Sequence, residues 1–315
     1  MRLFLLSLAG ALLLLSGCAK ERKSVMVDPA LLPLVPADTI TMGGVRVEAL
    51  QKTDTWKRLN QSPEWTQTMD EFTKQVGFDP RTDLLDILWT SNGKESLTLV
   101  RNRVSQMNIE PMVRREGIQR LSYKGYPLLG DEEQAALFLN PSTAVVGRTQ
   151  RLREVIDARD GSKGGVSEAL LARLASIPAE TEVWAIATAA SISNLPASSV
   201  SSSGLAGNVM ANLPRLLSTM QNVTLSLDLD NGLSATAVAN CTSDEGARQL
   251  QGALKGFAGF ARLSLPAEHH DLLPILDSLE VRQKDSAATV YFRADLNALE
   301  RLQAAAQASK GIKAD

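Results

Sequence analysis

Hydrophobic and polar residues alternate most regularly on the two sides of Asn231-Gly232. The apolar positions are Val223, Leu225, Leu227 and Leu229 before this pair, and Leu233, Ala235, Ala237 and Ala239 after it. A period of two is typical of strands with one covered face. Asn-Gly favours a type I′ turn, in which both central residues have positive φ. We therefore predict an antiparallel hairpin with a type I′ turn here, and a less regular hairpin around Asn92-Gly93.

Other segments have the period of an α-helix. Ser62 followed by Pro63 predicts a helix that Ser62 caps, and Thr242 with Glu245 has the spacing of a capping box before a second helix. The apolar stripes that we expect these helices to bury are Trp65, Met69, Phe72 and Val76 in the first, and Leu250, Leu254, Phe257 and Ala261 in the second.

Several landmarks occur twice in the same order. Val35-Pro36-Ala37-Asp38-Thr39 recurs in the second half of the chain as Ile177-Pro178-Ala179-Glu180-Thr181. The two Asn-Gly pairs, and two strand-like runs that end before Arg148 and Arg293, recur at nearly the same spacing. Repetition at nearly one spacing predicts an internal duplication. The expected fold is α+β: two tandem ferredoxin-like (βαββαβ-type) repeats with antiparallel sheets and helices packed on one face.

The N-terminus begins with a basic residue and an apolar run. The run from Leu3 to Leu15 has the length of a signal segment and is too short to span a bilayer comfortably. Leu15-Ser16-Gly17-Cys18, which follows, resembles the lipobox of bacterial lipoproteins. The resemblance implies cleavage between Gly17 and Cys18, a diacylglyceryl group on the Cys18 thiol, and an acyl chain such as palmitate on its amino group. Ala19, in place of an aspartate, favours the outer membrane facing the periplasm over the inner membrane.

These features predict the organisation of the chain. We expect a signal peptide over residues 1–17, a tether over 18–33, a first repeat over 34–160, a linker with a helix over 161–176, a second repeat over 177–308 and a tail over 309–315. The body resembles uncharacterised predicted lipoproteins with duplicated α+β units, a resemblance that implies no activity and no site residues.

Composition and cysteine usage narrow the function classes. The 315 residues carry a formal charge of −2, so no basic excess indicates nucleic-acid binding. Cys18 and Cys241 are the two cysteines. If Cys18 is lipidated, Cys241 has no disulfide partner within the chain; we expect it to be a buried small apolar residue, the alternative being a reactive or intermolecular thiol.

Candidate catalytic or metal-binding groups are few. His269 and His270 are the two histidines, and with Glu268 and Asp271 they form at most a loose divalent site, because adjacent residues point in different directions. Gly161-Ser162-Lys163-Gly164-Gly165 lacks the P-loop spacing and is interpreted as a flexible linker. We therefore expect no catalytic residue, no metal and no cofactor.

Four tryptophans stand out in a chain poor in aromatic residues. Core packing is the expected role of Trp56, Trp65, Trp89 and Trp184, the alternative being a pocket wall or a partner anchor. Tyr123-Lys124-Gly125-Tyr126-Pro127 predicts a turn.

The sequence thus favours a lipid-anchored cell-envelope protein that is a non-catalytic binding or scaffold module. Its expected partners are the membrane, through the lipid, and an envelope protein or apolar ligand. The alternatives are a carrier or sensor of an apolar small molecule or lipid, and an envelope hydrolase.

Overall fold

The computed structural model describes residues 24–103, 118–161, 165–193, 213–265, 270, 272–298 and 301. Its strands are β1 (Thr41–Val45), β2 (Leu84–Ser91), β3 (Ser96–Asn102), β4 (Gln119–Tyr123), β5 (Tyr126–Gly130), β6 (Gln134–Asn140), β7 (Thr143–Arg148), β8 (Val183–Thr188), β9 (Met220–Asp228), β10 (Leu233–Cys241), β11 (Glu280–Lys284) and β12 (Ala287–Ala294). Its helices are η2 (Leu32–Leu34), α2 (Val47–Leu50), α3 (Asp54–Leu59), α4 (Pro63–Val76), α5 (Pro80–Asp83), α7 (Thr149–Gly161), α8 (Glu168–Leu174), α9 (Ala189–Ser193), α11 (Leu213–Ser218), α12 (Asp244–Leu263) and α13 (Leu273–Asp277).

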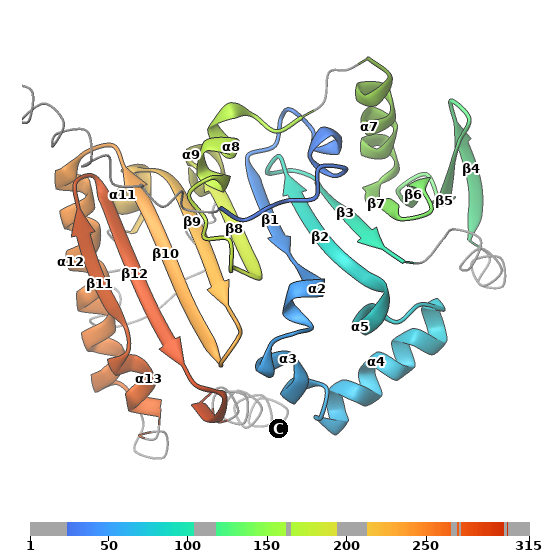
Figure 1. Ribbon diagram of the computed structural model, residues 1–315. Coiled ribbons are helices and arrows are strands. Elements are labelled where there is room, and N and C mark those ends of the chain that lie inside the picture. Colours follow the sequence, from blue (N-terminus) through green and yellow to red (C-terminus); the bar gives the residue numbers. More distant parts are fainter. Residues whose placement is uncertain are drawn as a thin grey trace, which may run out of the picture.

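All these strands form one 12-stranded sheet, in the order β11-β12-β10-β9-β8-β1-β2-β3-β7-β6-β5-β4 (Figure 1). Each pair of neighbouring strands in this order is antiparallel, which confirms the α+β class with an antiparallel sheet and helices. A ferredoxin-like unit is a split βαβ motif, which contains a parallel strand pair. The described ladders include no such pair, so a tandem ferredoxin-like arrangement is not confirmed.

The two halves of the chain meet at the ladder between β1 and β8. Its central pair is Gly43 and Ala185, whose separation along the chain equals the offset between the two Pro-Ala-acid-Thr motifs. Thr39 N donates to Pro36 O and Thr181 N donates to Pro178 O, so each motif forms the same kind of turn before its strand. One continuous sheet thus replaces the separate sheets expected for the two repeats.

The hairpin predicted around Asn231-Gly232 is present as β9 and β10, but its turn differs from the prediction. Gly232 has a φ of 109°, whereas Asn231 is not among the described non-glycine residues with positive φ. The last pair of the ladder is Asp228 with Ser234, so the loop is longer than the two residues of a type I′ turn. The type I′ prediction is therefore wrong. Lys124 and Gly125, by contrast, both have positive φ in the predicted turn between β4 and β5.

Two helix starts also differ from the prediction. Ser62 precedes α4, but its side chain makes no capping hydrogen bond. Ser243, not Thr242, caps α12, and its Oγ accepts from Gly246 N at 3.1 Å. The helix therefore begins one residue later than the capping box predicts.

The helices pack on opposite faces of the sheet in the two halves, so the prediction of one covered face is wrong. Directly paired residues of antiparallel strands point to the same side. One side carries Met42, Leu88, Leu99 and Val145 and packs against Leu152 of α7 and Leu170 of α8. The other side carries Ala239 and Ala288, which pack against Ala247 and Leu250 of α12. On the side that carries Met42, apolar Ile186 of β8 pairs with polar Thr224 of β9. The apolar side of the sheet therefore changes at this ladder.

The first described residues cross the α7–α8 side of the sheet as a strap. We call residues 24–35 the strap and this side the strap face. Val25 and Leu31 are buried in the same core as Met42 and Trp184. Residues 24–33 of the segment predicted as a tether, 18–33, therefore belong to the packed strap, so the tether prediction is wrong for them.

Candidate functional site

The side of the sheet opposite the strap carries no charged residue on the eight adjacent strands from β11 to β3, and we call this side the open face. One cross-strand row runs through its centre. From β11 to β5 it consists of Val281, Val290, Ala237, Leu225, Ala185, Gly43, Trp89, Thr98, Val146, Ala136 and Leu129. The neighbouring open-face positions include Val223, Leu227, Ala235 and Phe292. Charged residues of β9, β11 and β12, such as Asp228, Arg282 and Arg293, lie on the strap face.

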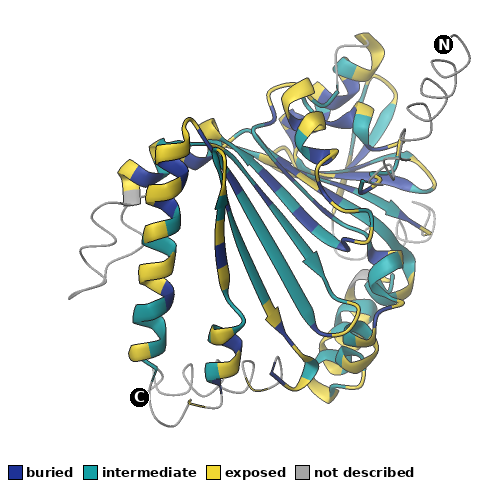
Figure 2. Ribbon diagram, turned by 60° about the vertical axis from the view of Figure 1, so that its left-hand side comes forward, coloured by how far each residue is buried: buried dark blue, intermediate teal, exposed yellow. Residues whose placement is uncertain are grey.

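Two large apolar residues of the strands on this side are exposed. Trp89 is 40% exposed and Val146 is 44% exposed, although both belong to the central row. In Figure 2, the strands beside the long helix α12 are mostly teal, the colour of intermediate burial. The sheet therefore presents apolar side chains to solvent that no described element covers completely.

Helix α12 covers only part of the open face. Leu250 is 4% exposed and packs with Ala239 and Ala288, whereas Phe257, two turns further on, is 46% exposed. The predicted buried stripe is thus confirmed at Leu250 and wrong at Phe257. Exposed Phe257 extends the apolar surface from the sheet onto the helix.

A solvent-open hollow of about 550 Å³ lies at the other end of this face. Leu129, Ala136 and Val146 of the central row line it, together with Ile118 and Asp131. Its volume is in the range of small-molecule sites.

The strap face holds a cluster of charged groups around Asp86. Burial raises the pKa of the Asp86 carboxyl to about 6, and the nearby charge of Asp28 adds to this effect. Arg101 Nε donates to Asp28 Oδ2 at 2.7 Å, and Arg46 Nη1 donates to the carbonyl oxygens of Ala179 and Thr181. The adjoining space of about 10 Å³ has room for about one water. The cluster therefore attaches the strap and is too confined for a substrate.

A second charged cluster joins the landmarks of the first half. Arg151, whose side chain is 10% exposed, donates to Asp38 at 2.8 Å and to Glu154 at 2.6 Å. Asn92 Nδ2 also donates to Asp38 Oδ2. Burial opposes ionisation of Asp38, but these hydrogen bonds outweigh it and hold the pKa of Asp38 below its ordinary value. The arrangement connects the Pro-Ala-Asp-Thr turn to the first hairpin and is structural.

Several residues singled out from the sequence lie outside the described residues: Gly17, Cys18, Ser162, Lys163, Gly164, Glu268, His269 and Asp271. His270 is exposed. Within the described ranges, no group of three or more His, Cys, Asp or Glu residues could hold a metal ion. Cys241 is buried, as predicted, and burial raises the pKa of its free thiol.

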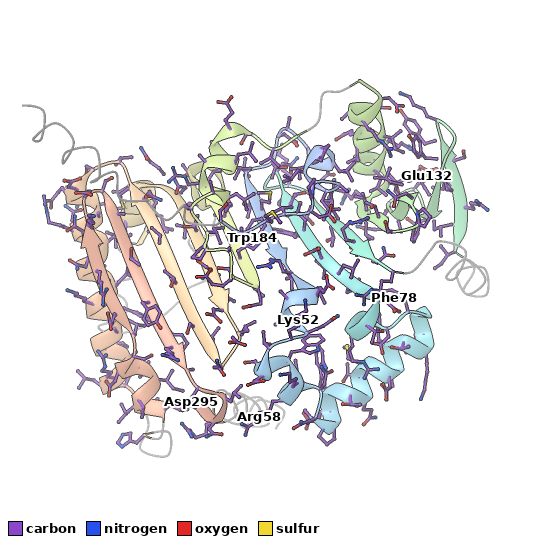
Figure 3. All side chains as sticks on the ribbon, viewed as in Figure 1. Lys52, Arg58, Phe78, Glu132, Trp184 and Asp295 are labelled. Carbon is purple, nitrogen blue, oxygen red and sulfur yellow. The ribbon has the colours of Figure 1, made fainter. Side chains whose placement is uncertain are left out.

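The tryptophans have different environments. Trp184 is 2% exposed at the centre of the sheet (Figure 3), so core packing is confirmed there. Trp56 and Trp65 form an edge-on pair between α3 and α4, with ring centroids 6.2 Å apart. Trp89 contradicts the core expectation because it lies on the open face. The alternation of Ile87 and Trp89 with Leu88 and Thr90 separates the two sides of the strand but does not indicate that Trp89 lies on the exposed one.

None of the described helices is both long and apolar enough to cross a membrane.

No protein-family model and no curated protein sequence matches the chain. Among solved structures, crystal form I of TP0453 is similar at 9% identity, with a TM-score of 0.47, covering 88% of this chain and 96% of that one. Form III has 10% identity and a TM-score of 0.47, covering 84% and 92%. Form IV has 13% identity and a TM-score of 0.43, covering 87% and 96%. These values carry no conclusion about family or function.

Proposed function

We propose that this protein is a lipid-anchored, non-catalytic binding module of the cell envelope, which holds an extended apolar surface of a partner protein on its open face. The anchor rests on the lipobox-like Leu15-Ser16-Gly17-Cys18, with Ala19 favouring the outer membrane. The uncharged cross-strand row that contains Trp89 and Val146 is the observation that carries the binding function.

The length of the row favours a protein surface over a small molecule. Its members come from eleven adjacent strands, and neighbouring strands lie about 4.8 Å apart, so the row extends over roughly 48 Å. A drug-sized ligand fills a cleft and buries most of its own surface there. An open apolar patch of this extent is more typical of a protein-binding surface.

The hollow beside Val146 supports a second candidate. A carrier or sensor of an apolar small molecule needs a local site, and the hollow of about 550 Å³ offers the volume for one. In this case the ligand would occupy the β5–β7 end of the open face and leave the α12 end free.

We also propose that the two halves are tandem copies of one α+β unit. The neighbouring strands β1-β2-β3-β7-β6 and β8-β9-β10-β12-β11 support this, because each half departs from the central ladder in the same sequence of elements. Gly43 and Ala185 are separated along the chain by as many residues as the two Pro-Ala-acid-Thr motifs, and this equal separation supports the duplication independently.

The anchor is tested by Cys18→Ala. We expect the wild-type protein to yield an N-terminal peptide that begins at an acylated Cys18 and to fractionate with the outer membrane. The variant should remain unprocessed at this position and lack the lipid mass. Processing and lipid attachment that persist in the variant would exclude Cys18 as the anchor.

The binding face is tested by photocrosslinking in intact cells with the anchored full-length protein. Ala235 and Thr236 are consecutive in β10 but point to the open face and the strap face, respectively. A photoreactive amino acid at position 235 should give one discrete protein adduct that is absent from position 236. A lipid-sized adduct at position 146 alone would favour the carrier, and equal adducts at 235 and 236 would contradict both candidates.

A further inference from the structure

We infer that the side of the body where the strap begins rests against the bilayer that holds the Cys18 lipid, and that the open face is directed away from that bilayer. The inference rests on the proposed lipidation of Cys18 and adds an orientation to it. The partner of this surface is therefore the lipid headgroup region of the protein's own membrane.

The first residues of the strap are fixed to the second half of the molecule. Val25 N donates to Ile177 O at 2.9 Å, and Ser24 forms a β-bridge with Pro178. Val25 is 3% exposed and Leu31 is 1% exposed. The start of the strap is thus held at a defined point, beside the turn of the second Pro-Ala-acid-Thr motif.

Polar contacts fix the strap a second time. Asp28 Oδ1 accepts from Ala30 N at 2.7 Å while its other oxygen accepts from Arg101. Arg101 also donates to Ser142 O at 3.1 Å and to Thr143 Oγ1 at 2.8 Å. Because the guanidinium group is held from both sides, these contacts oppose a release of the strap that would lengthen the tether.

The remaining tether is short compared with the body. From Cys18 to Ser24 the chain has six residue steps, which span at most about 21 Å at about 3.5 Å per step. A tether over the whole of 18–33 would reach roughly 50 Å by the same measure. A globular body of this size is roughly 50 Å across. A tether of about 21 Å therefore keeps the exit side towards the membrane.

The chemistry near the exit suits a headgroup region. Met26, which follows buried Val25, is 82% exposed. Residues 19–23 contain Lys20, Arg22 and Lys23 against one acid, Glu21. Basic residues close to an anionic lipid surface are attracted to it. An exposed apolar side chain behind a basic segment thus matches the boundary between headgroups and acyl chains.

The strap also sets the direction of the open face. Val25 and Leu31 pack with Met42 and Trp184 on the strap face. Since the open face is the opposite side of the same sheet, a body seated on the strap side leaves its uncharged row accessible from the aqueous compartment.

The test uses the lipidated full-length protein with Cys241→Ala, reconstituted into vesicles of phosphatidylcholine and phosphatidylglycerol. A fluorophore sensitive to polarity is attached at Met26→Cys or, as the matched control, at Leu263→Cys, which is 89% exposed on α12. We expect a blue shift at position 26 and several-fold stronger quenching there by spin-labelled lipids than at position 263. Quenching that is equal at both positions, or stronger at 263, would overturn the orientation.

A tether variant separates the geometry from the anchor. Fifteen Gly/Ser residues inserted between Lys23 and Ser24 should leave the protein on the vesicles but reduce quenching at position 26 several-fold. Unchanged quenching would show that the short tether does not orient the body. The mass of the N-terminal peptide is measured first: a missing lipid refutes the anchor, whereas a lipidated protein without preferential quenching at 26 refutes only the orientation.

Discussion

The indole of Trp184 occupies the space directly above the α-carbon of Gly44. The two residues pair across the ladder between β1 and β8. A β-carbon on Gly44 would lie 2.5 Å from Trp184 Cε2. The absent side chain at Gly44 therefore allows a large aromatic group to fill the centre of the sheet, where the two halves of the chain meet.

Gly44→Ala is expected to destabilise the protein. The added methyl group would push the buried ring of Trp184 against the surrounding core, and such overpacking costs about 1–3 kcal/mol. Denaturant unfolding followed by tryptophan fluorescence would measure the loss in the free energy of unfolding. A stability equal to that of the wild type would mean that Trp184 has another accommodating rotamer.

Gly252→Ala, by contrast, is expected to stabilise. Gly252 lies within α12, and no atom outside its own helical turn lies within 4 Å of a β-carbon built there. Alanine in a helix interior is favoured over glycine by about 0.5–1 kcal/mol. The same unfolding measurement should show a gain, and a loss would indicate that a partner group packs on this side of α12.

The start of α12 distinguishes two adjacent hydroxyl residues. Ser243→Ala removes the oxygen that accepts from Gly246 N and should lower the free energy of unfolding by about 1 kcal/mol. Thr242→Ala is the matched control and should have a much smaller effect. Equal losses in the two variants would contradict the assignment of Ser243 as the cap.

Asp86 should make stability decrease as the pH rises. Burial first, and then the charge of Asp28, raise its pKa from the ordinary 3.8 to about 6 in the folded protein. The folded state therefore binds the proton of the Asp86 carboxyl more tightly than the unfolded state does. The stabilisation that comes from this proton is lost as the pH rises from about 4 to about 6. Asp86→Asn should gain on the order of 1 kcal/mol at pH 7, allowing for solvent screening, and almost nothing near pH 4. Thermal unfolding at the two pH values checks this, and a loss at pH 7 would show that Arg46 or Arg101 stabilises the carboxylate.

Local residue patterns are enough to predict most of the individual elements. The alternation from Val223 to Ala239 predicts the hairpin of β9 and β10, and the apolar stripe from Leu250 predicts α12, because these periods depend on residues close in the chain. The repeated Pro-Ala-acid-Thr motif also anticipates the equivalent turns before β1 and β8. Turn type and the capping residue are less predictable, since a shift of one residue in the ladder or helix start changes both.

Which face of the sheet each helix covers depends instead on contacts between distant segments. Alternation gives two sides to a strand but does not say what packs on either, and the antiparallel pairing of β1 with β8 joins residues from the two halves of the chain. This pairing extends one sheet through both halves and brings Trp89 and Leu225 into the same uncharged row. The burial of Val25 and Leu31 likewise depends on partners far along the chain, such as Ile177. Local sequence patterns specify elements, whereas non-local packing specifies the open face and the short tether.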